Sequence, residues 1–269
     1  MIPVLLKAAL PKIHAGGDLP DVSLTRDVVA LDADHVTTYA ALCGFPRKDT
    51  LPLTYPHLLA FRLHLEIMAD RAFPFPAIGT VHLENSITQH RPIALTEALQ
   101  VTARPDNLRR HAKGQVFDLL TTVHSAGELV WEETSTFLRR GPGDESAPGG
   151  TTYDEARPNG TVWQLPGNLG RRYAGISGDH NPIHLYGLTA KAFGFPRQIA
   201  HGMWSLARCV GALENRLHHQ VRVDVAFKKP ILLPGSVAFG SMPTDDGYAF
   251  SLTDPRNGAP HLVGRTVRT

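Results

Sequence analysis

The chain has 269 residues, of which 42% are hydrophobic, and its formal net charge is +2. These values allow one large domain or two of ordinary size, and no apolar run reaches the roughly 20 residues that a membrane helix needs. No basic stripe indicates a nucleic-acid surface. Cys43 and Cys209 lie in apolar settings typical of buried thiols in a reducing compartment, and segment 1–10 is a poor signal peptide because Lys7 interrupts it. We therefore expect a cytoplasmic protein that binds neither nucleic acid nor membranes.

The first half of the chain predicts a helix followed by antiparallel strands. The apolar pattern indicates a helix over residues 58–69. Strands are predicted at 98–103, 114–125 and 128–138, and the segment Ser125-Ala-Gly-Glu128 forms the hairpin turn between the last two. Glycine and proline are then too dense over residues 141–150 for a helix or a central strand, so this segment is predicted to be a linker.

The second half repeats this order of elements. Apolar residues at steps of three and four predict a helix over residues 203–217. Residues 221–227 alternate strictly between apolar and polar, as in a strand with one buried face, and further short strands are predicted at 236–240, 248–252 and 261–267. A long helix followed by an antiparallel meander predicts an α+β fold in which the sheet wraps the helix.

The two halves also share sequence landmarks in the same order, which predicts an internal duplication. The matched segments are 39–44 with 173–178, 57–62 with 201–206, and 87–93 with 225–231. We therefore expect one unit over residues 1–140, the linker at 141–150, and a second unit over 151–269.

The most informative segment is residues 178–184, which read Gly-Asp-His-Asn-Pro-Ile-His. Asp179 and His184 are proton-transfer groups, and Asn181 can fix their geometry by hydrogen bonds without titrating. Gly202 lies at a predicted helix start, where free backbone N–H groups favour an anion and a glycine permits close approach. Taken singly, Asp179 is typical of a turn or cap and His184 of an ordinary polar residue. Together in this order, the residues favour the addition of water to an activated double bond, or its removal.

The same residues resemble a known signature. Segments 173–184 and 201–203 are similar to the MaoC-like, hydratase-2 family in its double hot-dog form, whose motif has an aromatic residue, small residues, Gly-Asp-x-Asn-Pro-x-His and a His-Gly-Met helix start. Phe227-Lys-Lys-Pro230 and Leu233-Pro-Gly235 also resemble this family. The resemblance implies two hot-dog units, each a long helix wrapped by an antiparallel sheet, with the sheets joined into one continuous sheet.

The family resemblance also implies an activity and its substrate. The expected enzyme is an (R)-specific 3-hydroxyacyl-thioester dehydratase, or in reverse a trans-2-enoyl-CoA hydratase, acting on thioesters of coenzyme A or acyl carrier protein. In the first half, Phe45-Pro-Arg47 follows Gly44 and lacks the acid, the amide and the imidazole. The resemblance therefore implies one working site, in the second half, and a degenerate first half.

The resemblance assigns roles to individual residues. Asp179 and His184 form the catalytic dyad, Asn181 supports it, and the Gly202 amide stabilises an oxyanion; which member of the dyad activates water is left open. The residues expected to contact the substrate are Tyr173, His201, Met203, Lys228 and Lys229. Candidates for the phosphates of the carrier are Lys228, Lys229, Arg171 and Arg172, and candidates to line an acyl tunnel are Phe61, Leu65, Phe73 and Phe75.

Other chemistries fit the sequence less well. His90, His111 and His124 form no close-set metal-ligand pattern, and Cys209 has no adjacent base. No Gly-x-Gly-x-x-Gly motif follows a strand, so neither a metal nor an organic cofactor is expected. Two alternatives stay open: a non-catalytic subunit that binds acyl thioesters, and a thioesterase on the same fold. A homodimer is also possible.

Overall fold

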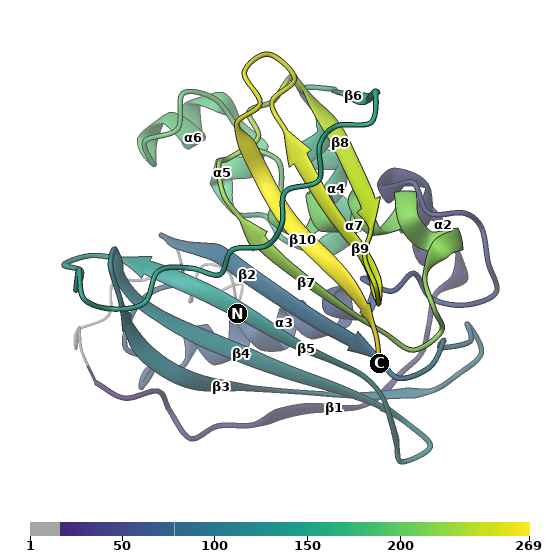
Figure 1. Cartoon of the computed structure of the whole chain (residues 1–269). Coiled ribbons are helices and arrows are strands. Elements are labelled where there is room, and N and C mark those ends of the chain that lie inside the picture. The colour runs from purple at the N-terminus through teal and green to yellow at the C-terminus, as the bar shows by residue number, and fades with distance from the viewer. Residues whose placement is uncertain (1–16, 78) are drawn as a thin grey trace.

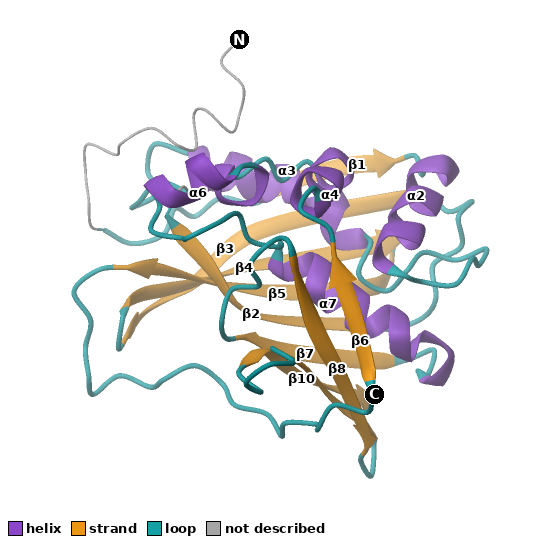
Figure 2. Cartoon of the chain, turned by 90° about the horizontal axis from the view of Figure 1, so that it is seen from above, coloured by secondary structure: helices purple, strands orange, loops and turns teal. Residues whose placement is uncertain are grey.

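A computed structural model describes residues 17–77 and 79–269; segment 1–10, which bears on the signal-peptide question, lies outside them. Ten strands form one antiparallel sheet, and the helices cover one of its faces (Figures 1 and 2). The strands are β1 (Leu24–Val29), β2 (Thr80–Gln89), β3 (Leu99–His111), β4 (Gly114–Ser125), β5 (Glu128–Arg140), β6 (Thr161–Leu165), β7 (Val221–Phe227), β8 (Gly235–Pro243), β9 (Gly247–Thr253) and β10 (Pro260–Arg268). The helices are α2 (Ala33–Cys43), α3 (Pro56–Ala69), α4 (Leu169–Ser177), α5 (Pro182–Leu185), α6 (Gly187–Ala192) and α7 (Gly202–Leu213).

The strand order is the same in both directions from the middle of the sheet. The order is β1-β3-β4-β5-β2-β7-β10-β9-β8-β6, so each half contributes five strands in equivalent sequence. At the junction, Asn85 pairs with Val225 and Ile87 pairs with Val223. In the sequence match between the halves, Ile87 corresponds to Val225, and therefore Asn85 to Val223 and Ser86 to Asp224. Exchanging the two halves turns the Asn85–Val225 pair into the Ile87–Val223 pair and leaves the Ser86–Asp224 pair unchanged. The predicted continuous sheet is confirmed, and its two halves are related by a pseudo-two-fold axis at this pair.

Most predicted elements are present, with corrections to their extent. The strand predicted at 98–103 continues to His111, and the helix predicted over 203–217 ends at Leu213, followed by a short 3-10 turn to Arg216. The prediction that each half starts with its long helix is wrong. A strand and at least one shorter helix precede α3 and α7, and the missed elements are β1, α2, β2, β6, α4, α5 and α6. These elements are short or only weakly periodic, except β2, where polar residues mask the alternation.

The helices α2 and α4 occupy equivalent places and end in the same way. Gly44 and Gly178 terminate them with φ angles of 75° and 76°, in the left-handed region that glycine adopts without steric cost. After Gly178 the chain turns directly into Asp179. The same turn in the first half leads to Phe45, which is buried and stacks on Tyr39.

The segment between the halves crosses the face of the sheet opposite the helices (Figures 1 and 2). Thr151 donates its Oγ1 hydrogen to Glu84 at 3.0 Å, and the Ser251 hydroxyl donates to the carbonyl of the buried Ala156. Asn159 then donates its backbone N–H to Phe239 at 3.2 Å. The connection is thus fastened to the sheet along much of its path.

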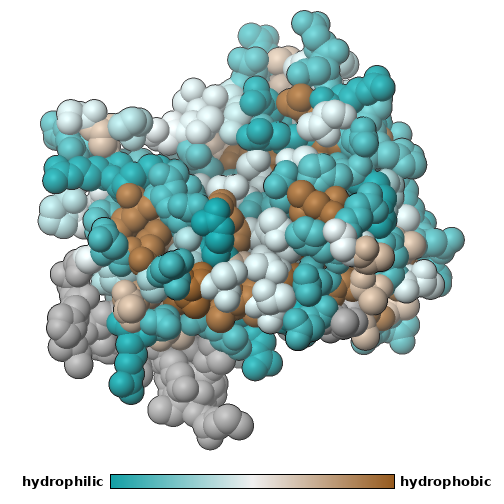
Figure 3. Space-filling model, turned by 90° about the horizontal axis from the view of Figure 1, so that it is seen from below, coloured by the Kyte–Doolittle hydropathy of each residue, from teal (hydrophilic) through white to brown (hydrophobic). Residues whose placement is uncertain are grey.

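The exposed surface in Figure 3 carries separate apolar patches surrounded by hydrophilic residues. Within residues 17–77 and 79–269, no helix is long and apolar enough to span a membrane. The possibility of a homodimer stays a prediction.

Candidate active site

The loop between α4 and α5 is held by a series of short-range hydrogen bonds. Ser177 Oγ accepts from the Asp179 N–H at 3.2 Å, and Asp179 Oδ1 accepts from the Asn181 N–H at 3.0 Å. Asn181 then caps α5, with Pro182 at the first helical position. Pro182 does not prevent this short helix from forming. Proline has a φ angle suited to the first turn of a helix and lacks only an N–H that has no helical partner there.

His184 lies on α5 and is buried, with 8% of its surface exposed. Its Nδ1 donates to the carbonyl oxygen of Ile199 at 2.9 Å. Ile199, which carries this carbonyl, is itself held by an antiparallel β-bridge to Leu232. Because a carbonyl can only accept, the proton is on Nδ1, and the neutral imidazole presents the lone pair of Nε2.

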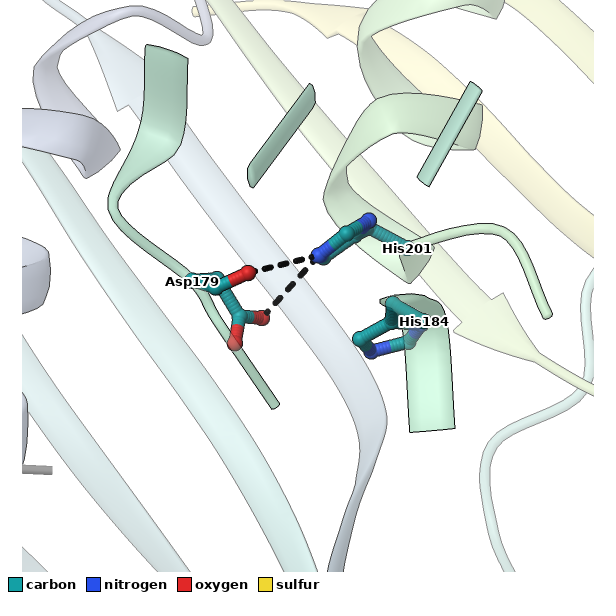
Figure 4. Close-up of side chains that lie close together, drawn as sticks. All are labelled: Asp179, His184 and His201. Carbon is teal, nitrogen blue, oxygen red and sulfur yellow. Dashed lines mark hydrogen bonds and ion pairs between the residues drawn. The ribbon is translucent and has the colours of Figure 1, made fainter. Parts of the chain in front are cut away.

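His201 joins Asp179 and His184 from the start of α7 (Figure 4). Its Nε2 donates to the Asp179 backbone carbonyl at 3.0 Å and lies 3.7 Å from Asp179 Oδ2. Its ring stacks on the His184 ring with 3.7 Å between centroids, and the Tyr173 ring lies 4.9 Å away. Through this hydrogen bond His201 also holds the Asp179 loop in place.

The protonation states of the three groups follow from their burial and their neighbours. Burial would raise the pKa of Asp179, but its electrostatic interactions with His201 and His184 and the N–H of Asn181 outweigh it and lower that pKa. Burial lowers the pKa of His184 despite the carboxylate of Asp179, and it lowers the pKa of His201 to about 3. At neutral pH the site therefore contains a carboxylate and two neutral imidazoles.

These groups face a cavity of about 490 Å³ that both halves of the chain line. The structure places along this cavity all nine residues that the sequence analysis gave as catalytic residues or substrate contacts. They are Asp179, Asn181, His184 and Gly202 as catalytic candidates, and Tyr173, His201, Met203, Lys228 and Lys229 as substrate contacts.

The first half contributes an apolar wall to the cavity. Phe61, Leu65 and Met68 follow one another at helical spacing on α3 and line it, as expected for the first two. The suggestion that Phe73 and Phe75 line a tunnel is not supported. They are buried in the core, where both rings pack within 5.2 Å of Phe117.

Basic groups surround another part of the cavity. The lining residues of this kind are Lys113, Arg140, Lys228, Lys229 and His261. Lys228 Nζ donates to the Thr151 carbonyl at 2.8 Å, so the connecting segment fixes this lysine. Arg171 lies elsewhere: it donates to the Leu185 carbonyl and lies over the Tyr186 ring. Arg171 and Arg172 do not line the cavity.

Sequence reasoning missed a buried pair in the first half. His57, which lines the cavity, donates from Nδ1 to Glu133 at 2.9 Å, and the side chain of Glu133 has 0% exposure. The signal was available in the alternation along β5, where Trp131, Glu133 and Ser135 all lie on the inner, buried face. A charged residue in phase with buried neighbours marks an unusual core position.

The same three groups could also accept a cation. Asp179, His184 and His201 each offer one ligand atom, and these atoms lie within 4.8 Å of one another. Two of the four ring nitrogens are already used as donors to carbonyl oxygens, so a metal would depend on the remaining two and on the carboxylate. The expectation of a metal-independent site stays a prediction.

Comparisons with known proteins agree with this arrangement. A family model described as MaoC like domain matches residues 165–242. The 3-hydroxyacyl-thioester dehydratase X of Mycobacterium tuberculosis is 38% identical over 270 residues, which covers 98% of this chain and 96% of that protein. The crystal structure of HtdX from Mycobacterium tuberculosis has a TM-score of 0.82 at 37% identity and covers 91% of this chain and 99% of that one. A MaoC-like dehydratase from Phytophthora capsici has a TM-score of 0.76 at 19% identity over 93% of this chain and 96% of that one, which shows the fold alone.

Proposed function

The chain belongs to the MaoC-like dehydratase family, and from this premise we propose that it interconverts (R)-3-hydroxyacyl and trans-2-enoyl thioesters. The observation that carries the proposal is the convergence of the Asp179 carboxylate and the His184 imidazole, held by His201 and Ile199, on one cavity with the start of α7. The double hot-dog fold and the 38% identity to a 3-hydroxyacyl-thioester dehydratase support it.

The protonation states suggest how water is added. The Asp179 carboxylate and His184 Nε2 are both proton acceptors at neutral pH, so either can take a proton from water as its oxygen attacks C3. At neutral pH neither the Asp179 carboxylate nor His184 Nε2 carries a proton that could go to C2. The proton on His184 Nδ1 is bound to the carbonyl of Ile199. We therefore assign the C2 proton to the one removed from water, carried by the dyad. Dehydration runs through the same steps in reverse.

The first turn of α7 supplies the groups for the thioester oxygen. Gly202 occupies the first helical position, and its N–H is directed away from the helix's own hydrogen bonds. A hydrogen bond and the helix dipole there stabilise the negative charge that develops on the oxygen during attack at C3. Removal of such a donor costs about 10²–10³-fold in kcat in enzymes that use one.

A proline at Gly202 tests this role without breaking the helix. Proline is suited to the first helical position, and His201 already has the extended backbone (φ −66°, ψ 138°) that precedes a proline. Gly202→Pro removes the N–H, whereas the matched control Gly202→Ala keeps it. A Cβ at this position lies 3.2 Å from Phe227 in both variants, so the steric effect of the Cβ is shared. We expect the kcat of the proline variant to be about 10²–10³-fold below that of the alanine variant; equal rates would contradict the assignment.

The activity itself is tested with trans-2-enoyl-CoA substrates and analysis of the products. We expect loss of enoyl absorbance without release of free thiol, and an (R)-3-hydroxyacyl product on chiral analysis. Free thiol would instead identify a thioesterase. Binding of the substrate without turnover, in folded protein, would identify a non-catalytic subunit.

The remaining assignments follow from the cavity. We propose that the catalytic unit is residues 151–269, that residues 1–140 are a degenerate copy which supplies the acyl wall through Phe61 and Leu65, and that 141–150 joins them. Lys228 and Lys229 are proposed to meet the phosphates of coenzyme A or of acyl carrier protein, with Lys113 and Arg140 as neighbours on the same lining.

A further inference from the structure

Beneath α3, the first half contains a buried network of polar side chains that the reaction described above does not use. Glu133 accepts from His57 Nδ1 with both carboxylate oxygens at 2.9 Å, and Asn85 Nδ2 donates to it at 2.7 Å. Burial would raise the pKa of Glu133, but the charge and hydrogen bond of His57 outweigh it and lower that pKa to about 2. A carboxylate is thus kept ionised in the core, which is costly unless it is paired.

The fold itself does not require this network. On the sheet, Ile87 pairs with Glu133, and its counterpart Val225 pairs with Gly264, so Glu133 and Gly264 are equivalent positions. In the second half no side chain fits at this position: a Cβ on Gly264 would lie 2.5 Å from the Asp224 carbonyl oxygen and 2.6 Å from the Phe250 ring. The unit that carries the dyad therefore has no charged side chain at the position equivalent to Glu133, so the fold does not explain why the first half has the Glu133–His57 pair.

One polar atom of this network, Nε2 of His57, is free to face the cavity. His57 is 5% exposed and lines the cavity, while its Nδ1 is bound to Glu133 behind it. Its Nε2 has no hydrogen-bond partner among the described residues, and this atom is not fully buried. His82 lines the same cavity and has a fully buried Nε2 without a partner. Polar atoms of this kind in an otherwise apolar lining commonly orient a ligand.

The position of His57 on α3 says which part of an acyl chain it meets. His57, Phe61, Leu65 and Met68 form one stripe of α3 along the cavity, about 16 Å long at 1.5 Å per residue. His57 is the end of the stripe that connects to the first turn of α7. Its ring stacks on His82, whose ring lies 5.0 Å from Phe227, and Phe227 lies against Gly202. An acyl chain that leaves the dyad along α3 meets one polar group first and three apolar side chains after it.

The hydrogen-bonding capacity of His57 determines which substituent on the acyl chain it can bind. With Nδ1–H donated to Glu133, the neutral His57 presents an acceptor at Nε2 and the protonated form presents a donor. A hydroxyl group can form a hydrogen bond with either form of His57. A ketone can bind only the protonated form, and a methylene group can bind neither. Resting on the proposed function, we infer that His57, held by Glu133, is a specificity subsite for acyl thioesters with a hydroxyl group on the carbons just beyond the reacting double bond.

The test compares ten-carbon trans-2-enoyl-CoA substrates that differ only in one hydroxyl group. The panel is the unsubstituted chain and the chains hydroxylated at C5, at C6 and at C10. For the wild type we expect kcat/KM for the C5 or the C6 alcohol to be about 10- to 100-fold above that for the plain chain, because the latter leaves His57 Nε2 unpaired. The C10 alcohol places its hydroxyl about one helical turn further along α3, beside Phe61, and should be disfavoured.

Two variants assign this preference to the residue. His57→Leu should abolish the C5 or C6 preference, while Phe61→Leu, a change on the same stripe that keeps it apolar, should retain it. Thermal unfolding is recorded first, and His57→Met replaces His57→Leu if the latter does not fold. A wild type that turns over the plain chain without preferring either alcohol overturns the inference, as does a preference that survives in the His57 variant. Failure to turn over any chain instead refutes the proposed function.

Discussion

Hydration of a trans-2-enoyl thioester by Asp179→Asn is expected to be about 10²–10⁴-fold slower than by the wild type, measured as kcat/KM. Interactions with His201, His184 and the Asn181 N–H hold the pKa of Asp179 below its usual value despite burial, so Asp179 is ionised at neutral pH and available as a base. The asparagine keeps an oxygen that can accept from the Asn181 N–H, and so preserves the turn, but it cannot take a proton. The change therefore removes basicity with little change of shape.

The control for Asp179→Asn is a substitution in the same turn. His180 is exposed and does not line the cavity, so His180→Gln should have a rate close to that of the wild type. Binding of the substrate to Asp179→Asn, followed by calorimetry, should persist. A rate within tenfold of the wild type would show that Asp179 is not the catalytic carboxylate, and His184 alone would then have to carry the proton.

Acidification from pH 7 to pH 5 is expected to lower the free energy of unfolding by several kcal/mol. Burial lowers the pKa values of His64, His82 and His201 to about 3. Between the ordinary histidine value near 6.5 and this folded value, the unfolded chain binds protons that the folded chain does not. The stabilisation is therefore complete above about pH 6.5 and is lost as the pH falls, by about 1.4 kcal/mol per unit for each histidine.

Thermal unfolding at a series of pH values measures this loss. We expect the Tm to fall by roughly 10–20 °C between pH 7 and pH 5. His64→Gln, which can keep a hydrogen bond to Thr121 but does not titrate, should reduce the slope by about one third. The exposed His219, changed to Gln, should leave the slope as it is. A Tm that is constant over this range would mean that the buried histidines do not stay neutral in the folded state.

The sequence predicted the parts of the fold in which local pattern and tertiary structure agree. The alternation of residues 221–227 marks β7 to the residue, and Gly114–Ser125 is β4 as expected. In the motif from Gly178 to His184 the hydrogen bonds of the turn join residues two positions apart, so this turn is local to the chain, although the helix α5 that follows it was not predicted. Glycine at 178 and proline at 182 determine the two ends of this turn.

What the sequence did not predict depends on contacts between distant segments. The orientation of His184 depends on the carbonyl of Ile199, and Glu133 is 76 positions from His57. Phe73 and Phe75 are aromatic, as residues that line an acyl tunnel would be, but in the structure both pack against Phe117 in the core. A pattern along the chain gives the face of a strand or helix, whereas the opposing element decides whether that face meets a cavity or a side chain.

The Ser86–Asp224 pair at the middle of the sheet bears on which fragments of this protein can associate. In a symmetric homodimer, a residue on the axis meets its own copy. Two copies of the second half would bring two Asp224 carboxylates together where Ser86 now donates a 2.8 Å hydrogen bond, and like charges opposite each other on neighbouring strands are destabilising. Arg222 and Arg265 already bind the remaining sites of the single carboxylate. The junction thus favours the association of unlike halves, because Ser86 at the centre of one half complements Asp224 at the centre of the other.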